Sequence, residues 1–180
     1  MKRHILIGCF ACVLSMTSLS HAQAVPTASR VGSIQAGVGA LFISPDYAQQ
    51  YIKGLTFYAD YDIAHNIGIE GEIHYSVITP TDLSENSYLI GPRYTYHQKK
   101  FGIYAKALFG VGRFGTQGGA FQKVTTTGYT EYAFGGGVEY HVTRSINIRG
   151  IDVELQKWPG FPPNGLSPIA YTVGVAYVFH

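Results

Sequence analysis

The 180-residue chain has little cysteine and no apolar run long enough to cross a membrane as a helix. Its two cysteines, Cys9 and Cys12, both lie near the start, so residues 25–180 contain none. A disulfide scaffold, a thiolate metal site and a cysteine nucleophile are therefore excluded from that part of the chain. The sequence also has no phosphate-binding loop, no metal-binding motif and no G-x-S-x-G elbow.

The first 24 residues have the composition of an export signal. Lys2 and Arg3 form a positive n-region, and the apolar stretch from Ile5 to Leu14 follows. Ala22-Gln23-Ala24 is an A-x-A cleavage site. The sequence therefore predicts a cleaved secretory signal peptide over residues 1–24, with Ala22 and Ala24 at the cleavage site, followed by one domain over residues 25–180.

Removal of the signal leaves a chain with no net charge. Lys2 and Arg3 leave with the signal peptide, so 11 basic residues face 11 acidic ones when histidine is neutral. Nucleic-acid binding would require a basic patch in the exported domain, so no nucleic-acid partner is predicted.

Apolar side chains alternate with polar or small ones at a period of two, and no sustained helical spacing occurs. Strands are predicted over 33–42, 55–63, 67–77, 88–96, 102–112, 131–142, 147–157 and 169–179. In the last strand, Tyr171 and Val173 belong to an apolar face, whereas Ala170 and Thr172 belong to a face of small or polar side chains. Eight is even, as bacterial membrane barrels require.

The predicted connections alternate between short and long. Residues 64–66, 97–101 and 143–146 are short turns, and 44–54, 78–87, 113–130 and 158–168 are longer loops. Short periplasmic turns and longer outer loops are typical of exported barrels. Aromatic residues near both sets of ends, including Trp158 at the long-loop end and Tyr140 at the short-turn end, predict two interfacial girdles.

If the apolar faces point to lipid, the charged faces point inward. The interior is then predicted to hold a polar network of Glu70, Glu72, Arg93, Lys106, Glu139, Asp152 and Glu154. An eight-stranded barrel is just wide enough for side chains to fill it, so this set is interpreted as a network of ion pairs and hydrogen bonds. A narrow ion path or a pocket is the alternative. No metal and no cofactor are predicted.

Two residues disturb the alternation. Pro92 cannot donate a ladder hydrogen bond, so a bulge or a missing bond is expected there. Arg149 falls on the apolar parity of its strand, while Ile148 falls on the polar one. Either the long Arg149 side chain reaches the lipid head groups, or a bulge reverses the parity.

Several stretches resemble a known family. The segments 88–94 and 104–112, the strand pattern and the signal peptide resemble the small outer-membrane β-barrel domains of the OmpA-like and opacity-protein superfamily. Thr172, Gly174, Tyr177 and Phe179 resemble the terminal signal that the barrel-assembly machinery reads, although His180 follows the last aromatic residue. The resemblance covers about residues 31–179 and implies a barrel alone, with no peptidoglycan-binding domain.

The predicted fold class is thus all-β: an eight-stranded antiparallel up-and-down transmembrane barrel in the outer membrane of a Gram-negative-type bacterium. The expected role is structural or surface-interacting, adhesin- or porin-like, without catalysis. Outer-membrane lipids and lipopolysaccharide are the expected surroundings, with the assembly machinery as a partner during biogenesis; the surface ligand is left open.

Three alternatives remain open at this stage. His74 and Ser76 resemble the His-x-Ser pair of outer-membrane lipid A deacylases, so a lipid A-modifying hydrolase is one. A small-solute channel is the second. The third is a soluble calycin-like barrel with its apolar faces inside.

Overall fold

The computed structural model describes residues 31–47, 50–78, 83–116 and 125–179. The predicted signal peptide and its cleavage residues Ala22 and Ala24 lie outside the described residues. Within the described part of the chain, no helix is long and apolar enough to cross a membrane.

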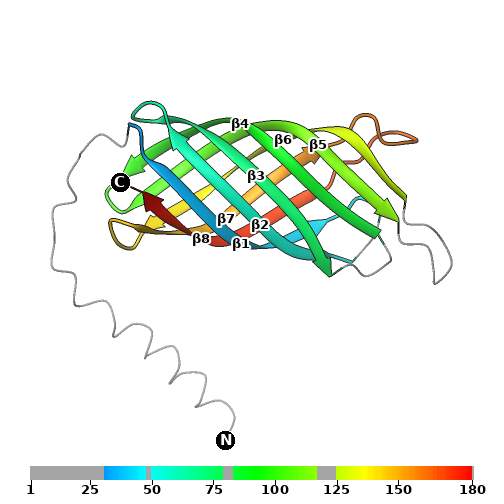
Figure 1. Ribbon diagram of the computed structural model, residues 1–180, viewed down its shortest axis with the longest axis horizontal. Coiled ribbons are helices and arrows are strands. Elements are labelled where there is room, and N and C mark those ends of the chain that lie inside the picture. The colour runs from blue at the N-terminus through cyan, green and yellow to red at the C-terminus, as the bar shows by residue number, and fades with distance from the viewer. Residues whose placement is uncertain (1–30, 48–49, 79–82, 117–124, 180) are drawn as a thin grey trace, which may run out of the picture.

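The described strands form a closed barrel in which each strand pairs with its neighbours in sequence and β8 pairs with β1 (Figure 1). The strands are β1 (Ile34–Ser44), β2 (Ile52–Asp62), β3 (Ile67–Ile78), β4 (Leu83–Gln98), β5 (Phe101–Thr116), β6 (Thr125–His141), β7 (Ile146–Lys157) and β8 (Ile169–Phe179). Every pairing is antiparallel. The predicted eight-stranded up-and-down barrel is confirmed.

The alternating sequence places apolar side chains outside the barrel and polar ones inside it. In β3, for example, Ile69 and Ile73 are exposed on the outer face, whereas Glu70, Glu72 and His74 are buried in the lumen. Side chains at successive strand positions point to opposite faces, so the same division recurs around the barrel. A soluble barrel would have the reverse arrangement, and that alternative is therefore wrong.

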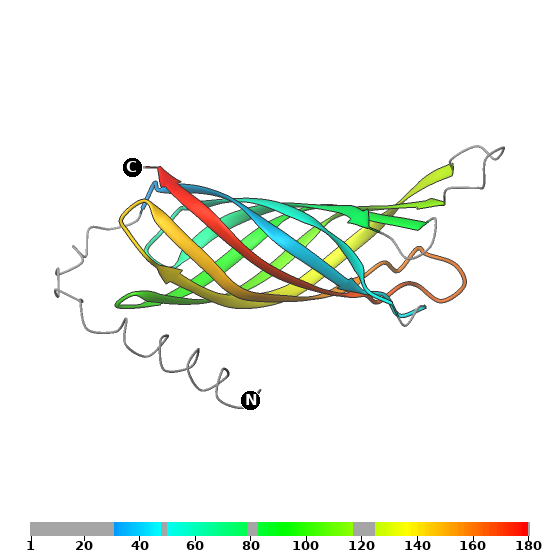
Figure 2. The same ribbon diagram turned by 90° about the horizontal axis from the view of Figure 1, so that it is seen from below.

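Three strands are longer than their sequence pattern indicated. β4, β5 and β6 have 16, 16 and 17 residues, against 11 or 12 in the other strands. The pairing of β5 with β6 continues as far as Thr116 and Thr125. Figure 2 shows these paired ends extending beyond the other strands, at the end of the barrel opposite the short turns. Much of the segment predicted as the long loop 113–130 is therefore a β-ribbon.

β7 contains the bulge that explains Arg149. Gly150 and Ile151 are both exposed, and the pairing register with both β6 and β8 shifts at this point. The extra residue turns Arg149 into the lumen, where it is fully buried. The alternative in which Arg149 reaches the lipid head groups is therefore wrong.

Pro92 leaves a gap in the ladder without a bulge. Its strand pairs with β5 on both sides of Gly91 and Pro92, in an unchanged register, but these two residues have no paired partner on β5. Of the two expectations, the missing bond is correct.

Candidate functional site in the barrel lumen

Lys106 lies at the centre of the buried charged side chains. Its Nζ is 2.5 Å from Glu154, 2.6 Å from Glu72, 2.7 Å from Asp152 and 3.0 Å from Glu70. The carboxylates come from β3 and β7, which lie on different sides of the lumen from β5. One ammonium group therefore joins three strands that are not neighbours in the sheet.

Arg149 forms a second centre. Its guanidinium nitrogens lie between 2.9 and 3.4 Å from five carboxylates: those of Asp60, Glu70, Glu72, Glu139 and Asp152. Its plane also lies 3.6 Å above the ring centroid of Tyr58. Gly37 provides the space for that ring, because a Cβ added there would overlap it.

Arg93 completes the network at its short-turn side. Its guanidinium is 2.7 Å from Asp60, 2.8 Å from Glu139 and 3.3 Å from Glu70, and it lies 4.0 Å from the ring centroid of Tyr104. Buried charges are tolerated when they are paired and hydrogen-bonded, and every cation here meets at least three carboxylates. We call these three cations and the six carboxylates that they contact the lumen network.

The structure brings the seven residues of the predicted network together. All seven are buried and all belong to the lumen network, whose other two members are Asp60 and Arg149. Asp60 shares the inward parity of Thr56 and Tyr58, so the alternation of β2 could have identified it. Arg149 was missed because the β7 bulge reverses the parity on which the prediction relied.

A cluster of aromatic rings covers the long-loop end of the lumen. Phe161 packs against Phe114 at 4.9 Å and against Tyr129 at 5.1 Å between ring centroids. Tyr47 meets Phe114, and Trp158 meets Tyr129. Trp158 is completely buried, so its predicted place in the outer aromatic girdle is wrong. We call these five residues the aromatic roof.

Tyr47 links the roof to the acidic side chains beneath it. Its hydroxyl donates a hydrogen bond of 2.5 Å to Glu85, which is buried. Burial, followed by the charge of Glu85, raises the pKa of Tyr47 above its ordinary value. The phenol therefore remains a donor, and the loop between β1 and β2 stays bonded to β4.

His74 and Ser76 share the lumen face but do not form a catalytic pair. The Ser76 hydroxyl donates to the Glu85 carbonyl oxygen and accepts from the Glu85 N–H at 3.0 Å. The His74 Nδ1 is bonded instead to the Gln156 side chain at 3.1 Å. A serine nucleophile needs its base within hydrogen-bond reach, and here the base and the serine have other partners.

Two groups of side chains in the described residues have the composition of a cation site. Glu70, Glu72 and Asp152 form one, and Glu72, His74 and Glu154 form the other. The Lys106 ammonium contacts all three members of the first group, so that group already holds a cation, and it contacts Glu72 and Glu154 but not His74 in the second.

A polar recess lies at the short-turn end of the barrel, next to Arg93. It is lined by Ser33, Gln35, Asp62, Arg93, Thr95, His97, Glu139 and Val178. The Gln35 amide bonds to Asp60 and Glu139, and the Asn147 amide donates to Gln35 at 2.8 Å. The recess therefore ends on the lumen network and its amide partners.

A closed antiparallel barrel with an apolar exterior and a charged, filled interior defines the class of integral outer-membrane β-barrels. The family model for the outer membrane protein beta-barrel domain matches residues 9–179. The chain belongs to this family, and its location is the outer membrane. No match was found among curated protein sequences.

Solved structures share the fold at low sequence identity. Neisserial surface protein A superimposes with a TM-score of 0.67 at 14% identity, over 82% of this chain and 96% of that chain. Ail of Yersinia pestis, in complex with the heparin analogue sucrose octasulfate, gives 0.57 at 14%, over 83% and 99%. OprG from Pseudomonas aeruginosa gives 0.57 at 15%, over 83% and 97%.

Proposed function

We propose that the protein is a non-conducting outer-membrane anchor that presents the ribbon of β5 and β6 as a surface for contacts outside the cell. The lumen carries this proposal: the lumen network fills its middle and the aromatic roof covers the long-loop end. A solute would have to displace paired, buried charges to pass. The expected structural or surface-interacting role fits this arrangement better than a channel does.

The exposed part of the ribbon has a polar, weakly basic composition. Thr126, Thr127 and Thr130 are exposed along β6, and Arg113 is exposed on the neighbouring part of β5. Such hydroxyl and guanidinium groups form hydrogen bonds with anionic or hydroxylated ligands. The structure of Ail with a heparin analogue makes heparin a reasonable first probe.

Two measurements test the proposal. In planar bilayers the purified protein should give no unitary currents, and regular conductance steps would contradict a closed lumen.

Cells that express the protein should adhere to heparin-coated or matrix-protein-coated surfaces more than vector-only cells do. Arg113→Ala together with Thr127→Ala should reduce that adhesion, and Lys100→Ala, in the short turn at the opposite end, is the matched control. Equal adhesion of expressing and vector-only cells would contradict the contact role.

We infer that Thr172, Gly174, Tyr177 and Phe179 act as the signal for the assembly machinery. Tyr177 and Phe179 are exposed on the outer face and pack against each other at 5.0 Å, on the strand that closes the barrel against β1. Phe179→Ala should lower the amount of protein in the outer membrane more than Phe109→Ala, which removes another exposed outer-face ring. Normal levels of the Phe179 variant would contradict the role.

A further inference from the structure

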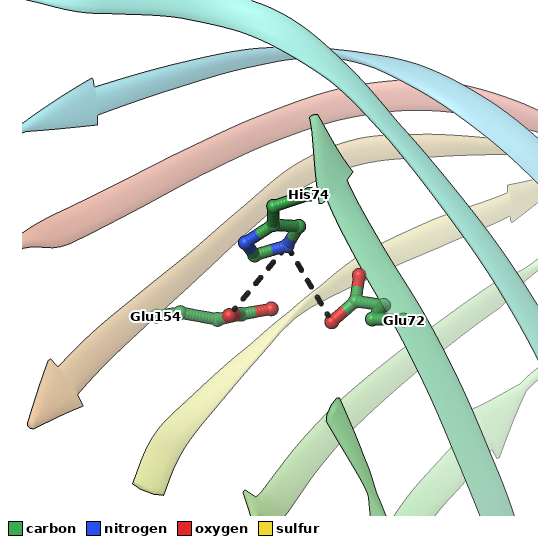
Figure 3. A group of neighbouring side chains, drawn as sticks. All are labelled: Glu72, His74 and Glu154. Carbon is green, nitrogen blue, oxygen red and sulfur yellow. Dashed lines mark ion pairs between the residues drawn. The ribbon is translucent and has the colours of Figure 1, made fainter. Parts of the chain in front are cut away.

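The second candidate cation group, Glu72, His74 and Glu154, contains a buried histidine nitrogen that forms no hydrogen bond within the described residues. His74 is buried, and its Nε2 points between two carboxylates, 3.8 Å from Glu154 and 4.0 Å from Glu72 (Figure 3). Neither distance is a hydrogen bond. Within the described residues, this nitrogen has no hydrogen-bond partner. A buried nitrogen atom without a partner is costly and requires an explanation, and a bound ion between the two carboxylates supplies one.

The donor set and its spacing match a divalent transition ion. Imidazole nitrogen and carboxylate oxygen bind such ions at about 2.0–2.2 Å, so two ligand atoms of a tetrahedral site lie about 3.4 Å apart. The three ligand atoms of Glu72, His74 and Glu154 all lie within 4.8 Å of one another. Movements of a few tenths of an ångström to about an ångström would bring them to bonding distance.

Gln156 is placed to orient the imidazole. Its side-chain amide lies 3.1 Å from His74 Nδ1 and 3.4 Å from Glu154. As placed, the amide NH2 group faces both His74 Nδ1 and Glu154, and the amide oxygen has no hydrogen-bond partner in the described residues. Ion binding by Nε2 requires this amide to turn over, so that its oxygen accepts from Nδ1–H and the lone pair of Nε2 is directed at the ion. Histidine ligands of metals are usually held in this way.

The charge balance of the lumen network favours an added cation. Within the part of the chain that the structure describes, the six carboxylates of the lumen network contact three lysine or arginine cations, Arg93, Lys106 and Arg149. Glu72 and Glu154 already bind Lys106, but each carboxylate offers about four lone-pair positions on two oxygens. Both can therefore hold an ammonium group and an ion together.

We propose that Glu72, His74 and Glu154 bind one divalent transition-metal ion, of the Zn²⁺ type, inside the barrel. Gln156 is the positioning residue for His74. All three ligands are buried, so the ion enters before the strands close and is retained in the folded barrel. Its role is structural, because it joins β3 to β7 across the lumen next to Lys106.

The test is refolding with and without metal. The protein is unfolded in chelator and urea and refolded into detergent micelles with Zn²⁺, with Co²⁺ or with chelator present. It is then desalted and analysed for metal. About one Zn²⁺ per folded barrel is expected, with a higher unfolding temperature than the metal-free sample and a ligand-field absorption spectrum for Co²⁺. Folded wild-type protein that binds neither ion would overturn the proposal and indicate that protons balance the acids.

Variants locate the ion. His74→Gln and Glu154→Gln should abolish binding of one equivalent, and Gln156→Met should weaken it by about 10–100-fold. His141→Gln is the matched control, because His141 is another buried lumen histidine and bonds to Asn147 at 2.8 Å. Heat-modifiable gel migration shows which variants fold. A folded His74→Gln or Glu154→Gln protein that keeps one equivalent would also overturn the proposal.

Discussion

At the scale of single residues, Arg149 shows how a buried charge connects the lumen. It contacts five carboxylates from β2, β3, β6 and β7 and stacks on Tyr58. Removing one member of a buried ion pair costs more than the pair itself contributes, because the other charge stays buried without compensation. Arg149 therefore matters mainly through the carboxylates that its loss would leave behind.

Arg149→Met should destabilise the barrel by about 3–5 kcal/mol, because several buried carboxylates lose a partner. Arg149→Lys should have a smaller effect, since it keeps the charge but loses the planar stacking on Tyr58. Denaturant unfolding of protein refolded into lipid vesicles measures both. Lys100→Met, exposed in the turn after β4, is the control, with a change within about 0.5 kcal/mol. Equal stability of Arg149→Met and wild type would show that the acids are neutralised by protons.

At the scale of elements, the β7 bulge determines which side chains reach the lumen. The apolar residues of β7 fall on even positions at Ile146 and Ile148 and on odd positions at Ile151 and Val153. The change of parity is visible in the sequence and has a bulge as one of its two explanations. It was ambiguous only because the long side chain of Arg149 offered a second explanation. The pairing registers with β6 and β8 place the bulge between Arg149 and Asp152.

Deletion of Gly150 should leave the barrel able to fold with a regular β7, and Gly150→Ala should be nearly neutral. The deletion removes the extra residue, so Ile151 follows Arg149 directly and regular alternation keeps Arg149, Asp152 and Glu154 in the lumen. A Cβ at Gly150 meets only the Val138 carbonyl oxygen, at an ordinary 3.5 Å. Heat-modifiable migration and recovery in outer-membrane fractions measure the result. A deletion variant that fails to fold would show that the barrel needs the local bend and twist of the bulge itself.

At the scale of the whole molecule, the sequence predicts the barrel well and the details of its long-loop end poorly. Strict alternation in eight segments is enough to predict the number of strands, their faces and the filled lumen. The pairing of particular acids with Lys106 depends on shear and tilt, which no single strand encodes. The aromatic roof depends on Trp158 turning inward where β7 ends, and Gly112 provides the space for its ring. A local pattern does not show such a long-range contact.

On the apolar exterior, the free-energy cost of placing a charged side chain should depend on its depth in the membrane. Val175 lies midway along the outer face of β8, beside Val38 and Ile148, whereas Tyr171 lies near the long-loop end of the same strand. Val175→Arg should cost about 2–4 kcal/mol of folding free energy in vesicles, and Tyr171→Arg about 0–1 kcal/mol. Denaturant titration in vesicles measures the unfolding free energy of both variants, which carry the same substituent on the same strand. Equal costs would mean that the outer face is not immersed in lipid as its composition requires.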